Sequence, residues 1–141
     1  MTIVVDASVA AKWLFQEPDA DKARALLVDT QTGRLTMIAP ELLPVEIASS
    51  LWKRVYREGL APDEVKAHYH RFLRLCPGLV GLSALTETAF GLALANKHPI
   101  YDCLYVALAL GIPCPLVTAD ERLFRAFGSA FPQVHLLRDW N

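Results

Sequence analysis

The chain has no surplus of basic charge and no cysteine framework. Its 14 Lys and Arg stand against 15 Asp and Glu, a formal net charge of −1, so the chain as a whole lacks the general attraction of a basic protein for nucleic acid. The three cysteines are odd in number and none form a C-x-x-C pair, which argues against a disulfide framework or a zinc knuckle. A reducing cytoplasm is the compartment that fits this cysteine usage.

Long hydrophobic runs and secretory features are also missing. Asp, Glu, Gly or Pro interrupts each apolar stretch well before the ~20 residues that a membrane span needs. The first apolar run has no basic segment ahead of it and is cut at once by Asp6. We therefore expect a cytoplasmic protein with no membrane segment.

Several common catalytic motifs are absent as well. There is no Gly-rich phosphate loop, and Ser8 has no G-x-S-x-G context. His68 and His70 are two residues apart and would point to different sides of a helix, while His98 and His135 have no neighbours at metal-ligand spacing. The sequence thus disfavours a serine hydrolase or a zinc hydrolase, and we interpret these histidines as surface or packing residues.

Strand-like and helix-like segments alternate along the 141 residues, 53% of which are hydrophobic. This length suits one domain spanning residues 1–141. Strands are expected at 2–5, 35–39, 115–118 and 133–137, with a weaker one at 79–83, and helices at 42–58, 62–75, 83–97, 100–110 and 121–127. A shorter helix is expected after the first strand, and another opens with Pro18 in its first turn. No hairpin dipeptide joins two strands, so we predict an α/β sandwich with a mostly parallel sheet and helices on both faces.

Four carboxylates interrupt or end apolar runs: Asp6, Glu46, Asp102 and Asp120. A lone charge in such surroundings costs several kcal/mol through desolvation. Two of these residues follow strand-like runs and two lie in apolar helices, and such elements can converge at one end of a parallel sheet. A convergent acidic cluster would require a divalent cation such as Mg²⁺ or Mn²⁺.

Some of the four positions also have local explanations. Asp6 could simply be a helix N-cap. Thr118 and Glu121 form a T-x-x-E capping box, in which Thr118 would cap the helix and Asp120 would face its positive end. Capping explains the position of Asp102 but not its apolar company. Glu46 is the hardest to explain locally, because serines occupy the positions three and four residues on, where a basic partner would have to lie.

Four segments, taken together, resemble the signature segments of PIN-domain ribonucleases: IVVDASVAAKW, APELLPVEIASSLWK, HPIYDCLYVALAL and PLVTADERLFRAF. The closest resemblance is to the VapC toxins of VapBC toxin–antitoxin pairs. It spans nearly the whole chain and implies a three-layer α/β/α sandwich with a sheet of about five strands. It further implies a metal-dependent endoribonuclease, usually homodimeric, that a VapB-type antitoxin inhibits.

The resemblance assigns roles to individual residues. The acidic quartet of the family is matched by Asp6, Glu46, Asp102 and Asp120. The hydroxyl positions that support its site are matched by Ser8 and Thr118. Two positions depart from the usual pattern. Ser49 stands where many members have Asn, which could alter a substrate or metal contact, and Cys103 stands where Ala is common, which we interpret as a neutral change of volume.

The chemistry can also be argued from the residues themselves. Cleavage of a phosphodiester needs an activated water and relief of charge in the transition state, and one or two Mg²⁺ ions supply both. We expect Asp6 and Asp102 to anchor the principal ion, with Glu46 and Asp120 acting through water or a second ion. Carboxylates this close would titrate collectively.

The sequence also contains candidate surfaces for binding RNA and a second subunit. Lys53, Arg54 and Arg57 cluster on one helix and are candidates for contacts with RNA phosphates, although solvated helix faces often look the same. The high apolar content favours a homodimer, with the helices that carry Trp13 and Trp52 as candidate contacts.

Three other functions are compatible with parts of the pattern. An aspartyl-nucleophile phosphatase would also end its first strand in Asp, but it would want a second Asp where Ser8 stands. A receiver-type signalling domain lacks its acceptor Asp and its Lys. A non-catalytic PIN-fold module that binds RNA or protein is the third alternative, and metal-dependent RNA cleavage would separate it from the enzyme.

Overall fold

Five short strands form one parallel sheet in the computed structural model, which describes residues 1–141. The strands are β1 (Thr2–Val5), β2 (Thr36–Pro40), β3 (Gly78–Val80), β4 (Leu116–Thr118) and β5 (Val134–Leu136). They lie in the order β3-β2-β1-β4-β5, and every neighbouring pair is parallel. The predicted parallel sheet is confirmed, and the weak strand expected at 79–83 forms one residue earlier and is shorter.

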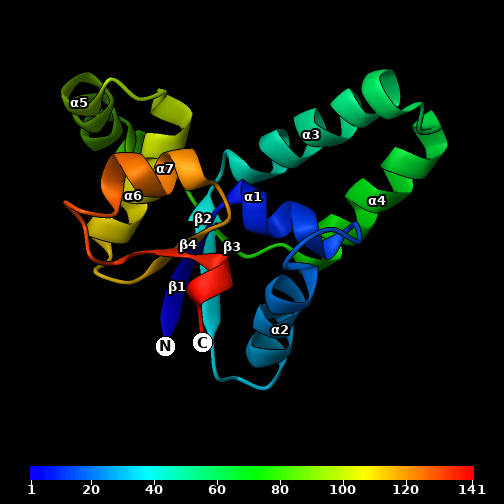
Figure 1. Cartoon of the computed structure of the whole chain (residues 1–141), viewed down its shortest axis with the longest axis horizontal. Coiled ribbons are helices and arrows are strands. Elements are labelled where there is room, and N and C mark those ends of the chain that lie inside the picture. Colours follow the sequence, from blue (N-terminus) through cyan, green and yellow to red (C-terminus); the bar gives the residue numbers. More distant parts are fainter.

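Helices cover both faces of this sheet, so the predicted three-layer sandwich is confirmed. The α-helices are α1 (Ala7–Ala10), α2 (Ala20–Gln31), α3 (Leu43–Glu58), α4 (Pro62–Leu75), α5 (Thr86–Asn96), α6 (Ile100–Gly111) and α7 (Glu121–Phe127). Three short 3₁₀ helices are η1 (Ala11–Trp13), η2 (Leu82–Ala84) and η3 (Leu137–Asp139). Figure 1 shows α5, α6 and α7 on one side of the sheet and α1 to α4 on the other.

The most apolar segments of the chain, β1 and α6, lie in the core. Ile3, Val4 and Val5 of β1 are fully buried, as expected for the middle strand of a sheet covered on both faces. Helix α6 is buried continuously from Cys103 to Ala109, which fits a helix that is apolar all round. None of the helices combines the length and the apolarity needed to cross a bilayer.

Two details differ from the expectations. Helix α2 begins at Ala20 and excludes Pro18, because Asp19 between them has a left-handed backbone (φ 63°) that no α-helix continues through. Trp13 is fully buried, and its indole nitrogen donates a 3.0 Å hydrogen bond to the carbonyl of Ala23. Trp13 therefore holds α2 against η1 and is not available as a contact for a second subunit.

The direction of the chain across the sheet changes at β1. The connection from β1 leads to β2 on one side, whereas β4 lies on the other side. Ligand sites in open parallel sheets form at such a switch point, beyond the carboxyl ends of the strands. Val5 pairs with Val117, so the residues that follow β1 and β4 meet at this edge.

Candidate active site

Asp6 lies at the carboxyl end of β1 and is only 4% exposed. Its Oδ1 accepts a 2.8 Å hydrogen bond from the amide of Ala7, as an N-cap of α1. Its Oδ2 accepts hydrogen bonds from the hydroxyls of Ser8, at 2.6 Å, and Thr118, at 2.7 Å. Asp6 is thus an N-cap, but capping does not explain why two hydroxyls donate to its second oxygen.

The two hydroxyls also join the turn after β1 to the turn after β4. Ser8 Oγ accepts from the amide of Ala119 at 2.9 Å, and Thr118 Oγ1 accepts from the amide of Asp120 at 3.0 Å. The predicted supporting positions, Ser8 and Thr118, are therefore both in direct contact with Asp6. They fix its carboxylate in one orientation.

Asp120 is the N-cap of α7. Its Oδ1 accepts from the amides of Arg122, at 2.8 Å, and Leu123, at 3.4 Å. The interpretation in which Thr118 caps this helix is wrong, because the Thr118 hydroxyl is directed to Asp6 and the helix begins after Asp120. Capping uses one oxygen of Asp120 and leaves the other for a ligand.

Asp102 stands in the first turn of α6, and its Oδ2 lies 2.8 Å from Nε2 of His98. The interpretation of His98 as only a packing residue is therefore incomplete, although its ring also packs edge-on against Phe127, with 5.3 Å between centroids. A signal for the contact was present in the sequence, since His98 precedes Asp102 by four residues. That spacing brings side chains together on helices.

Glu46 lies in the first turn of α3, and its Oε1 is buried without a hydrogen-bond partner. The hydroxyl of Tyr105, on α6, is likewise buried and unpartnered, and it lies near this carboxyl. Burial raises the pKa of Glu46 to about 7; the nearby Tyr105 hydroxyl opposes the rise, and the charges of Asp6 and Asp102 add to it. Burial followed by the charge of Glu46 raises the pKa of the Tyr105 phenol as well.

The four carboxylates share one electrostatic region. Burial is the main cause of a raised pKa at Asp6, the hydroxyls of Ser8 and Thr118 oppose the rise, and the charges of Asp102 and Asp120 add to it. The side chains do not, however, close into coordination distance, and no three His, Cys, Asp or Glu side chains form a ready metal cage. Three of the four are instead directed to donors of their own: hydroxyls for Asp6, His98 for Asp102 and backbone amides for Asp120. Oε1 of Glu46 has no such donor.

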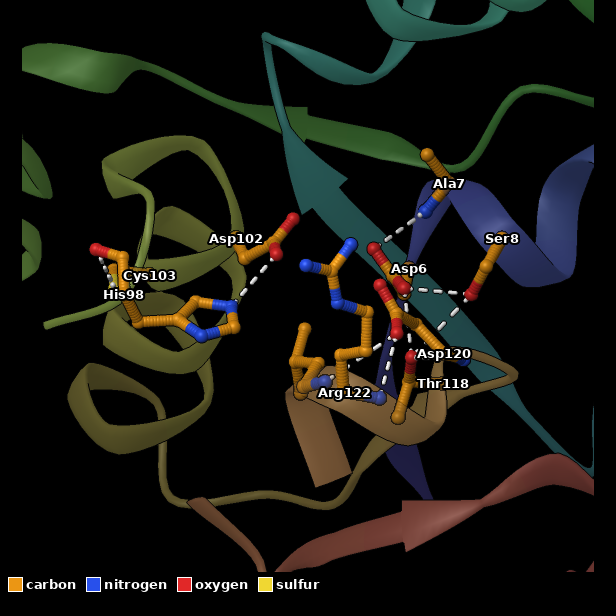
Figure 2. Close-up of polar contacts among 10 residues, drawn as sticks. Asp6, Ala7, Ser8, His98, Asp102, Cys103, Thr118, Asp120 and Arg122 are labelled. Atoms are coloured by element: carbon orange, nitrogen blue, oxygen red, sulfur yellow. Dashed lines mark hydrogen bonds and ion pairs between the residues drawn. The ribbon is translucent and has the colours of Figure 1, made fainter. Parts of the chain in front are cut away.

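Arg122 is a further charged residue at this site that the sequence reasoning missed. In Figure 2 its guanidinium extends into the space between Asp102 on one side and Asp6 and Asp120 on the other. It forms no ion pair with any of them. A cationic group directed toward three carboxylates lessens their mutual repulsion.

A groove of about 770 Å³ leads away from the site, and its lining includes Glu46 together with the predicted basic residues Lys53, Arg54 and Arg57. Arg54 is already engaged: its guanidinium lies 3.2 Å from both Glu17 Oε2 and Glu58 Oε2, and 3.7 Å over the ring of Phe15. Lys53 and Arg57 are exposed.

Comparison with known proteins defines the class. Residues 3–128 match the PIN domain family, so the chain belongs to the PIN-domain family. At the level of individual relatives, it is similar to ribonuclease VapC3 of Pyrobaculum aerophilum, with 32% identity over 90% of this chain and 95% of that protein. It is also 32% identical to ribonuclease VapC12 of Mycobacterium tuberculosis, over 89% of this chain and 92% of the relative.

Solved structures share the fold. The crystal structure of PAE2754 from Pyrobaculum aerophilum superposes with a TM-score of 0.70 at 19% identity and covers 98% of this chain and 85% of its own. VapBC2 from Rickettsia felis, bound to a DNA fragment from its promoter, superposes with a TM-score of 0.66 at 15% identity, over 96% of this chain and 97% of that one. At these identities the likeness concerns the fold alone.

Proposed function

We propose that this chain is a metal-dependent endoribonuclease that acts as the toxin of a toxin–antitoxin pair. The observation that carries the proposal is that Asp6, Glu46, Asp102 and Asp120 lie close enough for their charges to act on one another near the switch point between β1 and β4, with Asp6 buried and held by two hydroxyls. The full-length relatives named ribonuclease VapC support the same activity.

The donor set fits a hard divalent cation. All four candidate ligands are carboxylates, the ligands that Mg²⁺ and Mn²⁺ prefer. Oε1 of Glu46 is a buried acceptor with no partner inside the chain, which is costly unless a ligand satisfies it. We propose that Asp6 and Asp102 hold the principal Mg²⁺ or Mn²⁺, and that Glu46 and Asp120 act through water or hold a second ion.

When bound, such an ion activates a water molecule and offsets charge on the phosphate oxygens. The protein residues supply orientation around it. Ser8 and Thr118 fix Asp6, and His98 fixes Asp102, so these two carboxylates face the crevice in set directions. In the metal-free protein the pKa of Glu46 is about 7, so this carboxyl is partly protonated near neutral pH, and a bound cation would favour its charged form.

A phosphatase with Asp6 as nucleophile fits this geometry poorly. An attacking carboxylate oxygen must reach the phosphorus, whereas Asp6 is 4% exposed and both of its oxygens accept hydrogen bonds. A metal ion needs only a lone pair, and Oδ1 of Asp6 keeps one, because it accepts a single hydrogen bond, from the amide of Ala7.

The reaction is tested with purified protein and single-stranded or looped RNA. We expect cleavage with Mg²⁺ or Mn²⁺, no cleavage with EDTA, and toxicity when the chain is expressed in a host without its antitoxin. Because a metal site fails as a unit, Ala at any one of the four carboxylates removes most activity, and pairs of such changes add little more. A non-catalytic module would bind RNA and leave it intact under every one of these conditions.

We further propose that residues 1–141 act as a single PIN domain in the cytoplasm, where they pair with a VapB-type antitoxin and with a second copy of the chain. An apolar groove of about 320 Å³ between α3 and α4 supports a protein partner, because Trp52 and Tyr56 in its lining are 59% and 73% exposed. Light scattering at micromolar concentration tests the homodimer, and a monomer there would refute it. Coexpression with the product of a small neighbouring gene tests the antitoxin, whose presence would abolish RNA cleavage.

A further inference from the structure

One face of α3 forms a polar path from the acidic site to a basic end. Six of the polar α3 side chains along the 770 Å³ groove recur at intervals of three and four residues: Glu46, Ser49, Ser50, Lys53, Arg54 and Arg57. This spacing places them on a single helix face. Val45, Ile47 and Glu58 of α3 also line this groove. With 1.5 Å of rise per residue, the path from Glu46 to Arg57 is about 16 Å long.

Two cations are free at the basic end. Arg54 is held by Glu17, Glu58 and the ring of Phe15 and so braces the wall of the groove. Lys53 and Arg57 are exposed and form no ion pair within the chain. They are therefore available to a polyanion that lies along α3.

Tyr101 lines the same groove and directly precedes Asp102 on α6. Its side chain is 62% exposed, so its ring contributes little to the core. The groove thus has an exposed aromatic beside the carboxylates and free cations along α3. Grooves that bind single-stranded nucleic acid combine these same two features: aromatic faces for the bases and positive charge for the backbone.

We propose that Tyr101 is the stacking platform for an unpaired base beside the phosphate that is cleaved. The substrate is then a single-stranded RNA segment whose base stacks on Tyr101, whose scissile phosphate lies at the carboxylates, and whose adjoining backbone follows Lys53 and Arg57. A base inside a duplex is already stacked on its neighbours and cannot use this platform. The inference rests on the proposed ribonuclease function and specifies its substrate class.

Binding without cleavage tests this inference. The Asp6→Asn protein, with Mg²⁺, is titrated into a short single-stranded RNA that carries 2-aminopurine, a base whose fluorescence falls when it stacks. In this background Tyr101→Ala abolishes most of the quenching and weakens binding by about five- to 150-fold, the equivalent of ~1–3 kcal/mol per stacked base. Tyr101→Phe keeps the ring and preserves both signals.

Phe90→Ala is the matched control, because Phe90 on α5 is an aromatic residue 55% exposed that lines neither groove. It leaves RNA binding unchanged. The salt dependence of RNA binding separates the two kinds of contact. Lys53→Ala makes log affinity fall less steeply with log salt concentration. Tyr101→Ala lowers the affinity at every salt concentration without changing this slope, since stacking releases no counterions.

Three outcomes would overturn the inference. One is equal binding by the Tyr101→Ala protein, a second is equal affinity for a fully paired duplex, and a third is an effect of Tyr101→Ala on the oligomeric state or antitoxin binding with none on RNA. Failure of the proposed function looks different: the parent protein would then leave RNA intact, while the quenching in the Asp6→Asn background would still depend on Tyr101.

Discussion

Thr118 donates a 2.7 Å hydrogen bond to Oδ2 of Asp6, although the two residues are 112 positions apart in the chain. The contact joins the carboxyl ends of β1 and β4, the two strands at the switch point. Thr118 is fully buried and Asp6 nearly so, which makes the hydroxyl one of few groups able to solvate this carboxylate.

The first prediction concerns this hydroxyl. Thr118→Val keeps the volume of the side chain, but it leaves the Asp120 amide without its acceptor and removes one donor from Asp6. We expect the free energy of unfolding in urea at neutral pH to fall by about 2 kcal/mol. Thr118→Ser, which keeps the hydroxyl, loses much less. Equal stability of the Val variant and the parent would contradict this role.

The second prediction is a pH dependence set by Glu46. Its folded-state pKa, about 7, lies above the ordinary value of 4.5, so the folded protein binds more protons than the unfolded chain between these values. The contribution of Glu46 to stability is therefore complete below pH 4.5 and is lost as the pH rises through 7. Partial exposure limits the loss to roughly 1–2 kcal/mol.

Glu46→Gln isolates this contribution. Without an ionisable group at position 46, the metal-free variant loses less stability than the parent between pH 4.5 and 7 when both are followed by urea unfolding. Glu41→Gln is the control on a carboxylate whose side chain is exposed. Identical profiles for the parent and Glu46→Gln would contradict the raised pKa.

The third prediction concerns His98 as a positioning residue for Asp102. Loss of a side chain that orients a metal ligand typically weakens metal binding about 10- to 100-fold. At saturating Mn²⁺, His98→Ala therefore reduces the metal-induced stabilisation by about 1.4–2.7 kcal/mol, seen as a smaller rise in melting temperature. His98→Gln, which retains an N–H donor, restores part of the rise. If His98 had only a structural role, His98→Ala would lower the melting temperature equally with and without Mn²⁺, and the metal-induced rise would be unchanged.

The fourth prediction concerns the charge of Arg122. Because its guanidinium reaches toward Asp6, Asp102 and Asp120, Arg122→Ala increases their repulsion in the metal-free protein. Arg122 is exposed, so the expected loss is only about 0.5 kcal/mol, or roughly 2 °C in melting temperature. Mn²⁺ then raises the melting temperature more in the variant than in the parent. Arg125→Ala, on the same helix, changes neither the melting temperature of the metal-free protein nor its rise with Mn²⁺.

Much of the fold could be predicted because its elements carry strong local signals. The β-branched run at residues 2–5 became β1, and the apolar segment after Pro99 became α6, with bounds close to those expected. Gly59 ends α3 with φ 73°, the left-handed conformation that glycine adopts most easily. The start of α2 was missed because the left-handed backbone of Asp19 leaves no mark in a hydrophobic pattern.

The candidate site, too, could be predicted only in part from the sequence. The carboxylates were visible in the sequence because a lone charge in an apolar run is costly. Their partners were not, since the link from Thr118 to Asp6 depends on which strands are neighbours. The same long-range contact explains the wrong cap: the T-x-x-E pattern is local, but the Thr118 hydroxyl is already engaged by a residue on another strand.

Cleavage of RNA by the Asp6→Ala protein tests the central claim most directly. The parent, Asp6→Ala and Asp139→Ala are purified in parallel and given the same single-stranded RNA with Mn²⁺; Asp139 is a control carboxylate with a side chain 71% exposed. We expect the parent and Asp139→Ala to cleave at similar rates, EDTA to stop both, and Asp6→Ala to retain at most a trace of activity. Cleavage by Asp6→Ala as fast as by the parent, with contaminating nucleases excluded, would show that the four carboxylates are not the active site.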